Sequence, residues 1–565
     1  MRYPARLAEG SRPPWGLWAF LTLLVWGLFA PDRGLYQDDV SVLAVVQEAW
    51  KSAGVSGLFA PMGAPTRRLL GLPTFLAWLT PEPVFALQLL YGLAWLAIGW
   101  AAWRLARELF PVAPRAAWIA GTLTVCATGD FLTASPVALS YQTCTLLGLL
   151  GLAFAMRFVN GGPWPWLAAG GASAAASVFT GDGATVALAL APFLFVAARG
   201  FGTRTVAATS VWAAVLAPYG LLLAAAFRAP GSYVSQATVP LTLAARLRHT
   251  ASLTGNDLFP WTWPLGRVPF GDAPPRAIPV WIWVAAALCG LFFVMRMLQR
   301  LPGDQTSRDP ARERLLAGWC AVAAVAGHAA YAGVHFSEYY YRTQVLSRVL
   351  VSVVLGLAAS RLLEGGRAAR AAGLAVVALF SGFGIAGGME RQDMYLATWR
   401  RHRAELASLV EEVPRARPVA ILLLFVPHDP AFQATEAPYL AKRWSQLLWE
   451  NTATRPRTFL WSEDARTACV ADAEGLRCRM PEDQSCFDSG ACPGERLRWN
   501  EVVLLTWRPV EGRFRLEEEF PAALLGDQPP PLGRDRPRDL ILPGPPDPGT
   551  RRYLHGDVGL ARFLP

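Results

Sequence analysis

Residues 15–31 read WGLWAFLTLLVWGLFAP, an apolar run near the amino terminus that is long enough to approach the thickness of a membrane core. An apolar content of 53 % and a mean hydropathy of +0.29 agree with an α-helical polytopic membrane protein. Because further spans follow throughout, the first run is not expected to be a cleaved signal peptide. We expect about eleven transmembrane helices near residues 15–31, 82–103, 116–134, 138–157, 163–180, 183–198, 205–227, 277–298, 314–334, 343–363 and 371–388.

The basic residues behind the net charge of +10 are almost all Arg, and 14 of them lie in alternate short connections between the apolar runs. In a soluble protein this charge would suggest nucleic acid, but here the positive-inside rule explains it, so we expect no nucleic-acid partner. The rule places the amino terminus in the cytoplasm and, with an odd number of spans, the carboxy-terminal part outside. The connections predicted to be cytoplasmic contain Arg104, Arg107, Arg115, Arg157, Arg199, Arg204, Arg296, Arg300, Arg308, Arg312, Arg314, Arg361, Arg367 and Arg370.

The chain divides by composition into a transmembrane domain, 1–388, a soluble domain, 389–526, and a Pro-rich tail, 527–565, expected to be extended. In the soluble part, 419–426 and 501–507 are predicted to be buried strands and 439–451 a helix. The fold class is therefore a helical membrane domain followed by a small extracytoplasmic α/β domain. Long outer connections are expected at 32–81 and 228–276.

The eight cysteines fall into two groups. The first group lies in apolar spans, where thiols behave as small hydrophobic groups, and comprises Cys126, Cys144, Cys289 and Cys320. The second group lies in the polar tail and comprises Cys469, Cys478, Cys486 and Cys492. In an exported domain these four predict two disulfides, for which three connectivities exist. A structural zinc site is the alternative, although the sequence has no Cys-x-x-Cys pair.

An acidic pair follows the first span in the stretch Tyr36-Gln37-Asp38-Asp39. Adjacent carboxylates repel each other and resist burial, so their presence at a membrane face indicates chemistry rather than packing. One carboxylate is able to accept a proton from an acceptor hydroxyl, and the pair is able to bind Mg²⁺ or Mn²⁺ through oxygen ligands. The alternative is a solvated cap of a helix that begins near Val40.

Basic and aromatic side chains in two other outer connections are candidates for substrate binding. Arg342 is able to hold a phosphate with two parallel donors, and Tyr340 to hydrogen-bond it or stack on a sugar. The alternative is a local pair between Glu338 and Arg342, with the tyrosines forming an interfacial belt. In the connection 228–276, the residues predicted to face a phosphate or an anionic acceptor are Arg246, Arg248 and His249, for which a solvated helix face is the alternative.

Three further charged positions have mainly structural interpretations. Arg67 lies in the same outer connection as the acidic pair. Asp182 lies near the outer end of a span, within a Gly-Asp-Gly sequence that is typical of a tight turn. His328 lies inside the span 314–334, where a histidine hydrogen-bonded within the bundle is expected.

A first span followed at once by an acidic pair resembles the GT-C superfamily of membrane glycosyltransferases, in particular its protein-mannosyltransferase-like and aminoarabinose-transferase-like members. The resemblance implies an inverting transfer of sugar from a polyprenyl-phosphate donor, with Asp38 or Asp39 as the essential acidic residue. It also implies a location in the bacterial inner membrane, contact with membrane lipid, and a glycan, lipid or protein acceptor on the outer face.

Three other functions stay open at this point. The first is an envelope glycan polymerase or ligase that uses a lipid-linked oligosaccharide. The second is a non-enzymatic, membrane-anchored envelope protein, for which about eleven spans exceed what an anchor needs. The third is an ion-coupled transporter, which the sequence disfavours because such proteins carry ionisable residues near the middle of the membrane.

Overall fold

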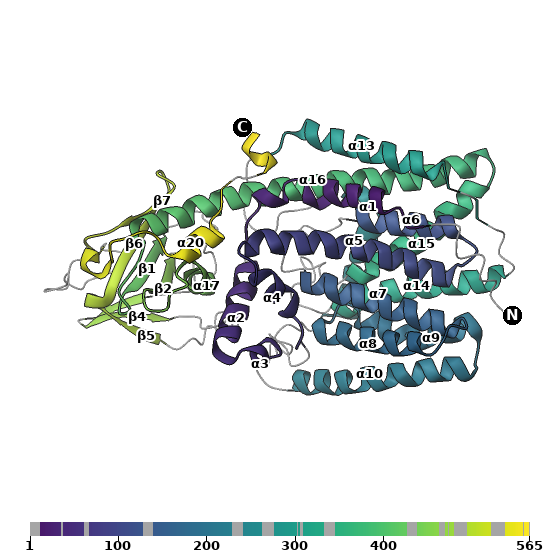
Figure 1. The fold of residues 1–565 in the computed structure, drawn as a ribbon, viewed down its shortest axis with the longest axis horizontal. Helices are drawn as coiled ribbons and strands as arrows, with labels where there is room; N and C mark the ends of the chain where they lie inside the picture. Colours follow the sequence, from purple (N-terminus) through teal and green to yellow (C-terminus); the bar gives the residue numbers. More distant parts are fainter. Residues whose placement is uncertain are drawn as a thin grey trace.

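A bundle of long helices and a smaller domain with two β-sheets lie end to end in the computed structural model of the protein (Figure 1). The structure describes residues 12–35, 38–60, 67–127, 139–228, 241–262, 276–301, 303–304, 309–332, 345–426, 438–462, 469–472, 474–479, 494–520, 537–556 and 559–563.

The bundle is built from apolar helices, and each of the eleven expected spans coincides with one of them. The first span comprises α1 (Trp15–Thr22), η2 (Leu23–Gly27) and η3 (Ala30–Asp32). The others are α5 (Pro83–Leu109), α6 (Pro114–Cys126), α7 (Leu139–Val159), α8 (Pro165–Thr180), α9 (Thr185–Arg199), α10 (Thr203–Arg228), α13 (Val280–Leu298), α14 (Pro310–Tyr331), α15 (Val345–Glu364) and α16 (Arg367–Glu412).

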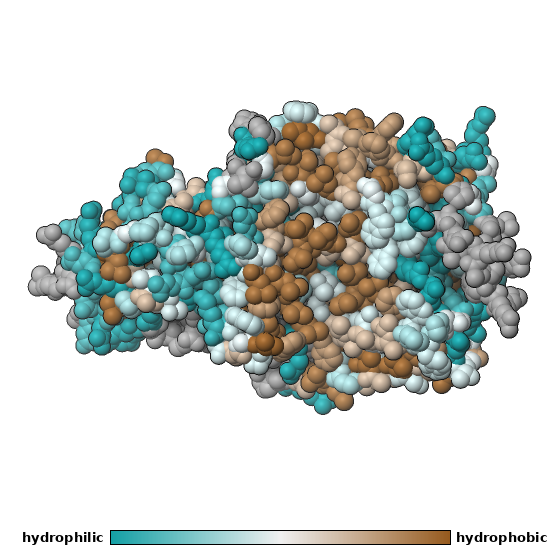
Figure 2. Space-filling view, viewed as in Figure 1, coloured by the Kyte–Doolittle hydropathy of each residue, from teal (hydrophilic) through white to brown (hydrophobic). Residues whose placement is uncertain are grey.

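In the described part of the chain, seven helices are long and apolar enough to cross a membrane. They are Trp15–Asp32, α5, α7, α10, α13, α15 and α16. The sequence predicted about eleven, and the difference arises partly from length, because α6, α8 and α9 have 13, 16 and 15 residues. Apolar side chains form a broad belt over the visible face of the bundle, between more polar surfaces at either end (Figure 2). This belt is the surface expected of a membrane domain.

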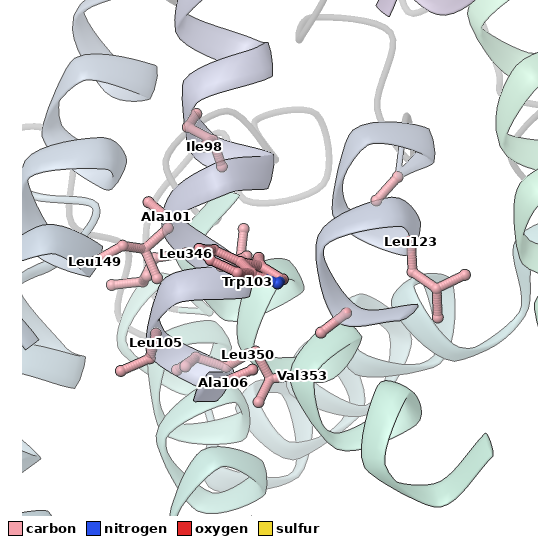
Figure 3. Close-up of a cluster of buried hydrophobic side chains, with 14 of the residues drawn as sticks. Ile98, Ala101, Trp103, Leu105, Ala106, Leu123, Leu149, Leu346, Leu350 and Val353 are labelled. Carbon is pink, nitrogen blue, oxygen red and sulfur yellow. The ribbon is translucent and has the colours of Figure 1, made fainter. Parts of the chain in front are cut away.

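The bundle core lies where α5, α6, α7 and α15 meet (Figure 3). Leu149 of α7 and Leu346 of α15 pack there beside residues of α5, and all of these side chains are buried. Small residues allow other helices to approach closely, because a Cβ on Gly356 of α15 would meet the backbone of α6, and one on Gly384 of α16 would overlap the carbonyl of Cys126. Such small-residue contacts are typical of packing between membrane helices.

Short helices lie between the bundle and the carboxy-terminal domain: α2 (Asp38–Ala53), α3 (Val55–Leu58) and α4 (Leu72–Trp78) (Figure 1). A helix was expected from Val40, and α2 begins two residues earlier, so that the acidic pair forms its first turn. The second long connection contains α12 (Leu243–Leu258) and η6 (Pro260–Thr262), and the sequence indicated a helix here only as the alternative interpretation of residues 246–249.

The carboxy-terminal domain contains a four-stranded sheet in the order β2-β1-β6-β7. Its strands are β1 (Ile421–Val426), β2 (Arg457–Ser462), β6 (Val502–Arg508) and β7 (Arg513–Leu516), and its helix is α17 (Pro438–Leu448). The first three strands are parallel, and the sequence ILLLFV of β1 is wholly buried, as expected of a covered parallel strand. The predicted strands, helix and α/β class are confirmed. A second, antiparallel sheet comprises β3 (Cys469–Asp472), β4 (Gly475–Arg479) and β5 (Gly494–Arg498).

Helix α16 has 46 residues and runs from the bundle to the carboxy-terminal domain, so the boundary predicted at 388 lies inside a continuous helix. The end of the chain, expected to be extended, contains η9 (Pro537–Leu540), α20 (Pro548–Tyr553) and η10 (Leu560–Phe563). Its described residues pack against the fold, and the side chain of Tyr553 is fully buried.

The bundle cysteines Cys126, Cys144, Cys289 and Cys320 are free thiols, and all but Cys289 are buried. No disulfide occurs among the described residues, but the side chains of Cys469 and Cys478 lie outside them, so the predicted pairing in the tail stays a prediction. Strand register places the backbone of Cys469 opposite that of Cys478. Cys486 and Cys492 lie outside the described residues.

Candidate functional site

The acidic pair lies on the side of the bundle that carries the carboxy-terminal domain (Figure 1). Asp39 is buried, with 1 % of its surface exposed, whereas the side chain of Asp38 lies outside the described residues. Because α14, α15 and α16 follow one another as antiparallel helices, the carboxy-terminal end of α14 and the amino-terminal end of α15 lie on this same side. The ends with the Arg residues predicted to be cytoplasmic lie on the opposite side, where Arg361 pairs with Glu313 at 2.6 Å.

A buried guanidinium, that of Arg33, interacts electrostatically with Asp39. Arg33 is 1 % exposed, its Nη2 donates to the carbonyl of Trp26 at 2.6 Å, and its Cζ lies 3.8 Å from the centre of the Trp26 ring. Its Nε and Nη1 have no hydrogen-bond partner among the described residues. Burial lowers the pKa of Arg33 to about 9. The groups that act against this shift are Tyr91, Tyr395, Asp32 and Asp39.

A second buried cluster joins three helices at the same side of the bundle. Oδ1 of Asp257, on α12, accepts a hydrogen bond from Nε of Arg348, on α15, at 3.0 Å. Oδ2 of the same carboxylate lies 2.8 Å from Nε2 of His328, on α14. The three side chains are between 0 and 2 % exposed. His328 is therefore hydrogen-bonded within the bundle, as predicted.

The guanidinium of Arg348 is only partly satisfied by this cluster. Its Nη1 and Nη2 are buried and have no hydrogen-bond partner in the part of the chain that the structure describes. Burial alone would raise the pKa of the Asp257 carboxyl, but its contacts with His328 and Arg348 outweigh this effect and hold that pKa below its ordinary value. Asp257 thus fixes Arg348 as a cation whose Nη1 and Nη2 have no partner among the described residues, an arrangement suited to binding an oxyanion.

Three of the residues predicted to bind substrate lie on α12, and the other three lie outside the described residues. Arg246 and Arg248 are exposed on α12, and His249 is half-buried there. Asp257 lies eleven positions after Arg246 on this helix, which corresponds to about 16 Å along the helix axis. The predicted residues Glu338, Tyr340 and Arg342 lie outside the described residues, as do His335, Tyr339 and Tyr341.

Arg67 and Asp182 pair with each other, at 2.8 Å between Nη2 and Oδ2. The hydroxyl of Tyr219 donates to Oδ1 of Asp182 at 2.7 Å, and Leu69 N donates to the carbonyl of Phe179 at 2.9 Å. These contacts attach the first long connection to the bundle, which favours a structural role for Arg67 and Asp182.

No group of three His, Cys, Asp or Glu side chains able to hold a metal ion occurs among the described residues. Asp39 is the member of the pair whose side chain is described, and a cation, Arg33, lies near it. The described residues therefore do not provide the ligand set that Mg²⁺ or Mn²⁺ needs, and metal binding by Asp38 and Asp39 stays a prediction.

Sequence reasoning missed Arg33 and Arg348 as candidate site residues. Arg348 lies inside the predicted span 343–363, where an ionisable residue is itself a signal of function. Arg33 immediately follows the first span and lies in the connection predicted at 32–81. Asp257 lies in the connection predicted at 228–276, and its neighbours in the sequence do not indicate its buried partners.

The chain is similar in three dimensions to known membrane enzymes, although no protein family and no curated protein matches its sequence. The structure of ArnT from Cupriavidus metallidurans bound to undecaprenyl phosphate is 13 % identical, has a TM-score of 0.46, and covers 88 % of this chain and 93 % of its own. The apo oligosaccharyltransferase of Archaeoglobus fulgidus is 12 % identical, has a TM-score of 0.44, and covers 78 % of this chain and 64 % of its own. These structural neighbours are GT-C membrane glycosyltransferases. At such identities and TM-scores, function must be inferred from the residues of this chain.

Proposed function

We propose that the protein is an inverting membrane glycosyltransferase that moves a sugar from a polyprenyl-phosphate donor to an acceptor. The observation that supports this proposal is the buried guanidinium of Arg348, which Asp257 holds in place and whose Nη1 and Nη2 have no hydrogen-bond partner among the described residues. Two parallel donors on a planar cation match the oxygens of a phosphate. Their position near the end of an apolar bundle suits a phosphate that is attached to a lipid.

Asp257 and His328 support this role of Arg348. A buried Arg without a counter-ion would be strongly destabilising, and the Asp257 carboxylate offsets this cost at the Nε edge of the guanidinium. His328 binds the other carboxylate oxygen and fixes its orientation. The fork of Nη1 and Nη2 is therefore held ready before any ligand arrives, which reduces the entropy lost on binding.

In the proposed reaction, Asp39 accepts the proton of the acceptor hydroxyl. The hydroxyl oxygen forms a bond to the anomeric carbon, while the bond from that carbon to the phosphate oxygen breaks. The leaving polyprenyl phosphate takes the electron pair, and Arg348 stabilises its negative charge. Asp38 is the alternative base. A metal ion bound by the pair is the part of the proposal for which the described residues provide no set of ligands.

The proposed location is the bacterial inner membrane, with the carboxy-terminal domain outside the cytoplasm. The Arg-rich helix ends, which lie away from that domain, support this orientation through the positive-inside rule. Arg342 and Tyr340 would add contacts to the donor phosphate or the sugar, and Glu338 to the sugar. Arg246, Arg248 and His249 would contact lipid phosphate or an anionic acceptor.

Binding of undecaprenyl phosphate to the full chain in nanodiscs tests the proposal. We expect Arg348→Gln to weaken binding by about tenfold or more, since charge-assisted hydrogen bonds are lost. Arg348→Lys keeps the charge beside Asp257 and should show an intermediate loss, because a lysine lacks the two-donor fork. Arg361→Gln is the matched control, because Arg361 lies on the same helix at its opposite end.

Equal affinity of wild type, Arg348→Gln and Arg348→Lys would contradict the assignment of Arg348. Absence of undecaprenyl phosphate binding in wild type would contradict a polyprenyl-phosphate donor altogether. A comparison with an undecaprenyl-linked oligosaccharide distinguishes the glycan ligase from the proposed enzyme. If the oligosaccharide is transferred whole, the ligase is correct.

A further inference from the structure

We infer that the carboxy-terminal domain and the end of the chain position helix α2, and with it the acidic pair, relative to the membrane bundle. This inference rests on the proposed function only in giving Asp39 a catalytic role. The end of the chain is called the terminal segment below and comprises residues 548–556 and 559–563. It contains α20 and η10.

The terminal segment binds the chain just before the acidic pair. Asp32 is fully buried, and its two carboxylate oxygens accept hydrogen bonds from the backbone N–H groups of Gly559 and Ala561. The carbonyl of Ala561 accepts a further hydrogen bond from Nη2 of Arg400, on α16, at 2.9 Å. The residues joined at Asp32 are 527 positions apart in the sequence. The outer end of the first span is thereby attached to α16 through the terminal segment.

A second contact lies one residue further along, at Arg33. The His555 ring lies near the backbone of Pro31 and Arg33, and its centre lies 5.6 Å from that of the Trp399 ring. Trp399 also covers Gly34 so closely that a Cβ at this position would overlap the indole. The three residues before Leu35 are therefore enclosed by α16 and the terminal segment.

The later part of α2 is attached to the carboxy-terminal domain. Glu450, which follows α17, accepts a hydrogen bond from Nε2 of Gln47 at 3.3 Å. Glu48 accepts one from Nε2 of Gln446 at 3.1 Å. Arg552 of the terminal segment pairs with Glu450 at 3.1 Å and donates to the carbonyls of residues 78 and 80, at the end of α4.

These contacts surround the acidic pair on both sides in sequence. The segment before Asp38 is fixed at Asp32, and the helix after Asp39 is fixed at Gln47 and Glu48. Asp39 itself is buried and interacts electrostatically with Arg33. A displacement of about 1 Å is enough to slow a proton transfer strongly, so contacts that set the pose of α2 affect catalysis without touching substrate. Asp32 and Glu450 are thus positioning residues.

Two pairs of variants of the full chain in nanodiscs test this inference. Asp32→Ala removes both acceptors of the terminal segment, whereas Asp32→Asn keeps one acceptor oxygen. Glu450→Ala removes the partner of Gln47, whereas Glu450→Gln keeps an oxygen able to accept its hydrogen bond. Glu313→Gln is the control, because Glu313 is a partly buried ion-pair partner on the opposite side, 14 % exposed against 22 % for Glu450.

The measurement is hydrogen–deuterium exchange of peptides covering 38–53, with the melting temperature and undecaprenyl phosphate binding as parallel measurements. We expect exchange in α2 to rise about tenfold in both Ala variants and less in Asp32→Asn and Glu450→Gln. Exchange in α5 and α15, the melting temperature and lipid binding should stay near wild type. In an assay of sugar transfer, the turnover rate should fall in the same order as α2 protection, with KM for the donor unchanged.

Unchanged exchange of α2 in the Ala variants would overturn the inference. A general rise of exchange over α5 and α15, with a lower melting temperature, would also overturn it, because the residues would then serve stability alone. Failure of wild type to bind undecaprenyl phosphate would contradict the proposed function but leave the exchange result valid, so the two failures are distinguishable.

Discussion

Nε of Arg348 lies 3.0 Å from Oδ1 of Asp257, and at most 2 % of either side chain is exposed to solvent. The pair joins α12 to α15 across 91 residues of sequence. Since α12 belongs to a long connection and α15 to the bundle, this contact determines where the connection lies on the membrane domain.

We expect Asp257→Ala to lower the free energy of unfolding by about 3–5 kcal/mol, because it leaves the Arg348 charge buried without its partner. The double variant Asp257→Ala, Arg348→Leu should recover a large part of this loss. Thermal unfolding in detergent measures both effects. If the single and double variants melt at the same temperature, the pair is not the source of the stability.

Asp39→Asn should abolish sugar transfer while leaving membrane insertion unchanged, since the amide cannot accept the proton of an acceptor hydroxyl. The measurement is the cellular glycan profile together with the amount of protein in the membrane. Asp38→Asn, tested in parallel, identifies the acting carboxylate, and Glu108→Gln, at the opposite side, is the control. Wild-type glycans in both Asp variants would refute the glycosyltransferase.

His555 makes docking of the terminal segment sensitive to acid. Burial, together with the nearby Arg403 charge, lowers the pKa of His555 from its ordinary value of 6.5, so the folded protein holds the neutral ring. The neutral His555 ring stabilises docking of the terminal segment fully above pH 6.5. This stabilisation is lost as the pH falls from there through the pKa of His555 in the docked state, because the ring takes up a proton more readily in the undocked state.

The measurement is hydrogen exchange of peptides covering 548–556, corrected for intrinsic rates, at about pH 7.5 and pH 5.5. We expect the wild type to lose protection at the lower pH, while His555→Gln shows the same protection at both values. A wild-type segment that is equally protected at both pH values would contradict the role of His555.

Local sequence patterns predicted the elements but not the contacts between them. The apolar run 371–388 and the strand sequence at 419–426 are recognisable because hydropathy and period are local properties. The hydrogen bond that Asp32 accepts from Gly559 joins residues 527 positions apart, and nothing in the sequence near Asp32 indicates this partner. Arg348 could have been identified from its place within an apolar span, whereas its partner Asp257 requires the fold.

Glycine at position 384 should be necessary for packing of α16 against α6. A Cβ there would overlap the carbonyl of Cys126, whereas a Cβ on Gly382, on the same helix, would meet nothing within 4 Å. We expect Gly384→Ala to destabilise the bundle by about 1–3 kcal/mol through overpacking, and Gly382→Ala to be neutral or stabilising. Comparison of the two melting temperatures measures the difference, and equal values would contradict close packing at Gly384.

The four tail cysteines should form two disulfides if the carboxy-terminal domain is exported. Register places Cys469 opposite Cys478 on neighbouring antiparallel strands, which favours a pair between them and leaves Cys486 with Cys492. Alkylation of denatured protein purified without reductant should therefore label four of the eight cysteines, and all eight after reduction. Cys469→Ser should free Cys478 and leave the other pair intact in peptide mapping by mass spectrometry. Eight reactive thiols before reduction would refute both the pairing and the outward orientation that predicts it.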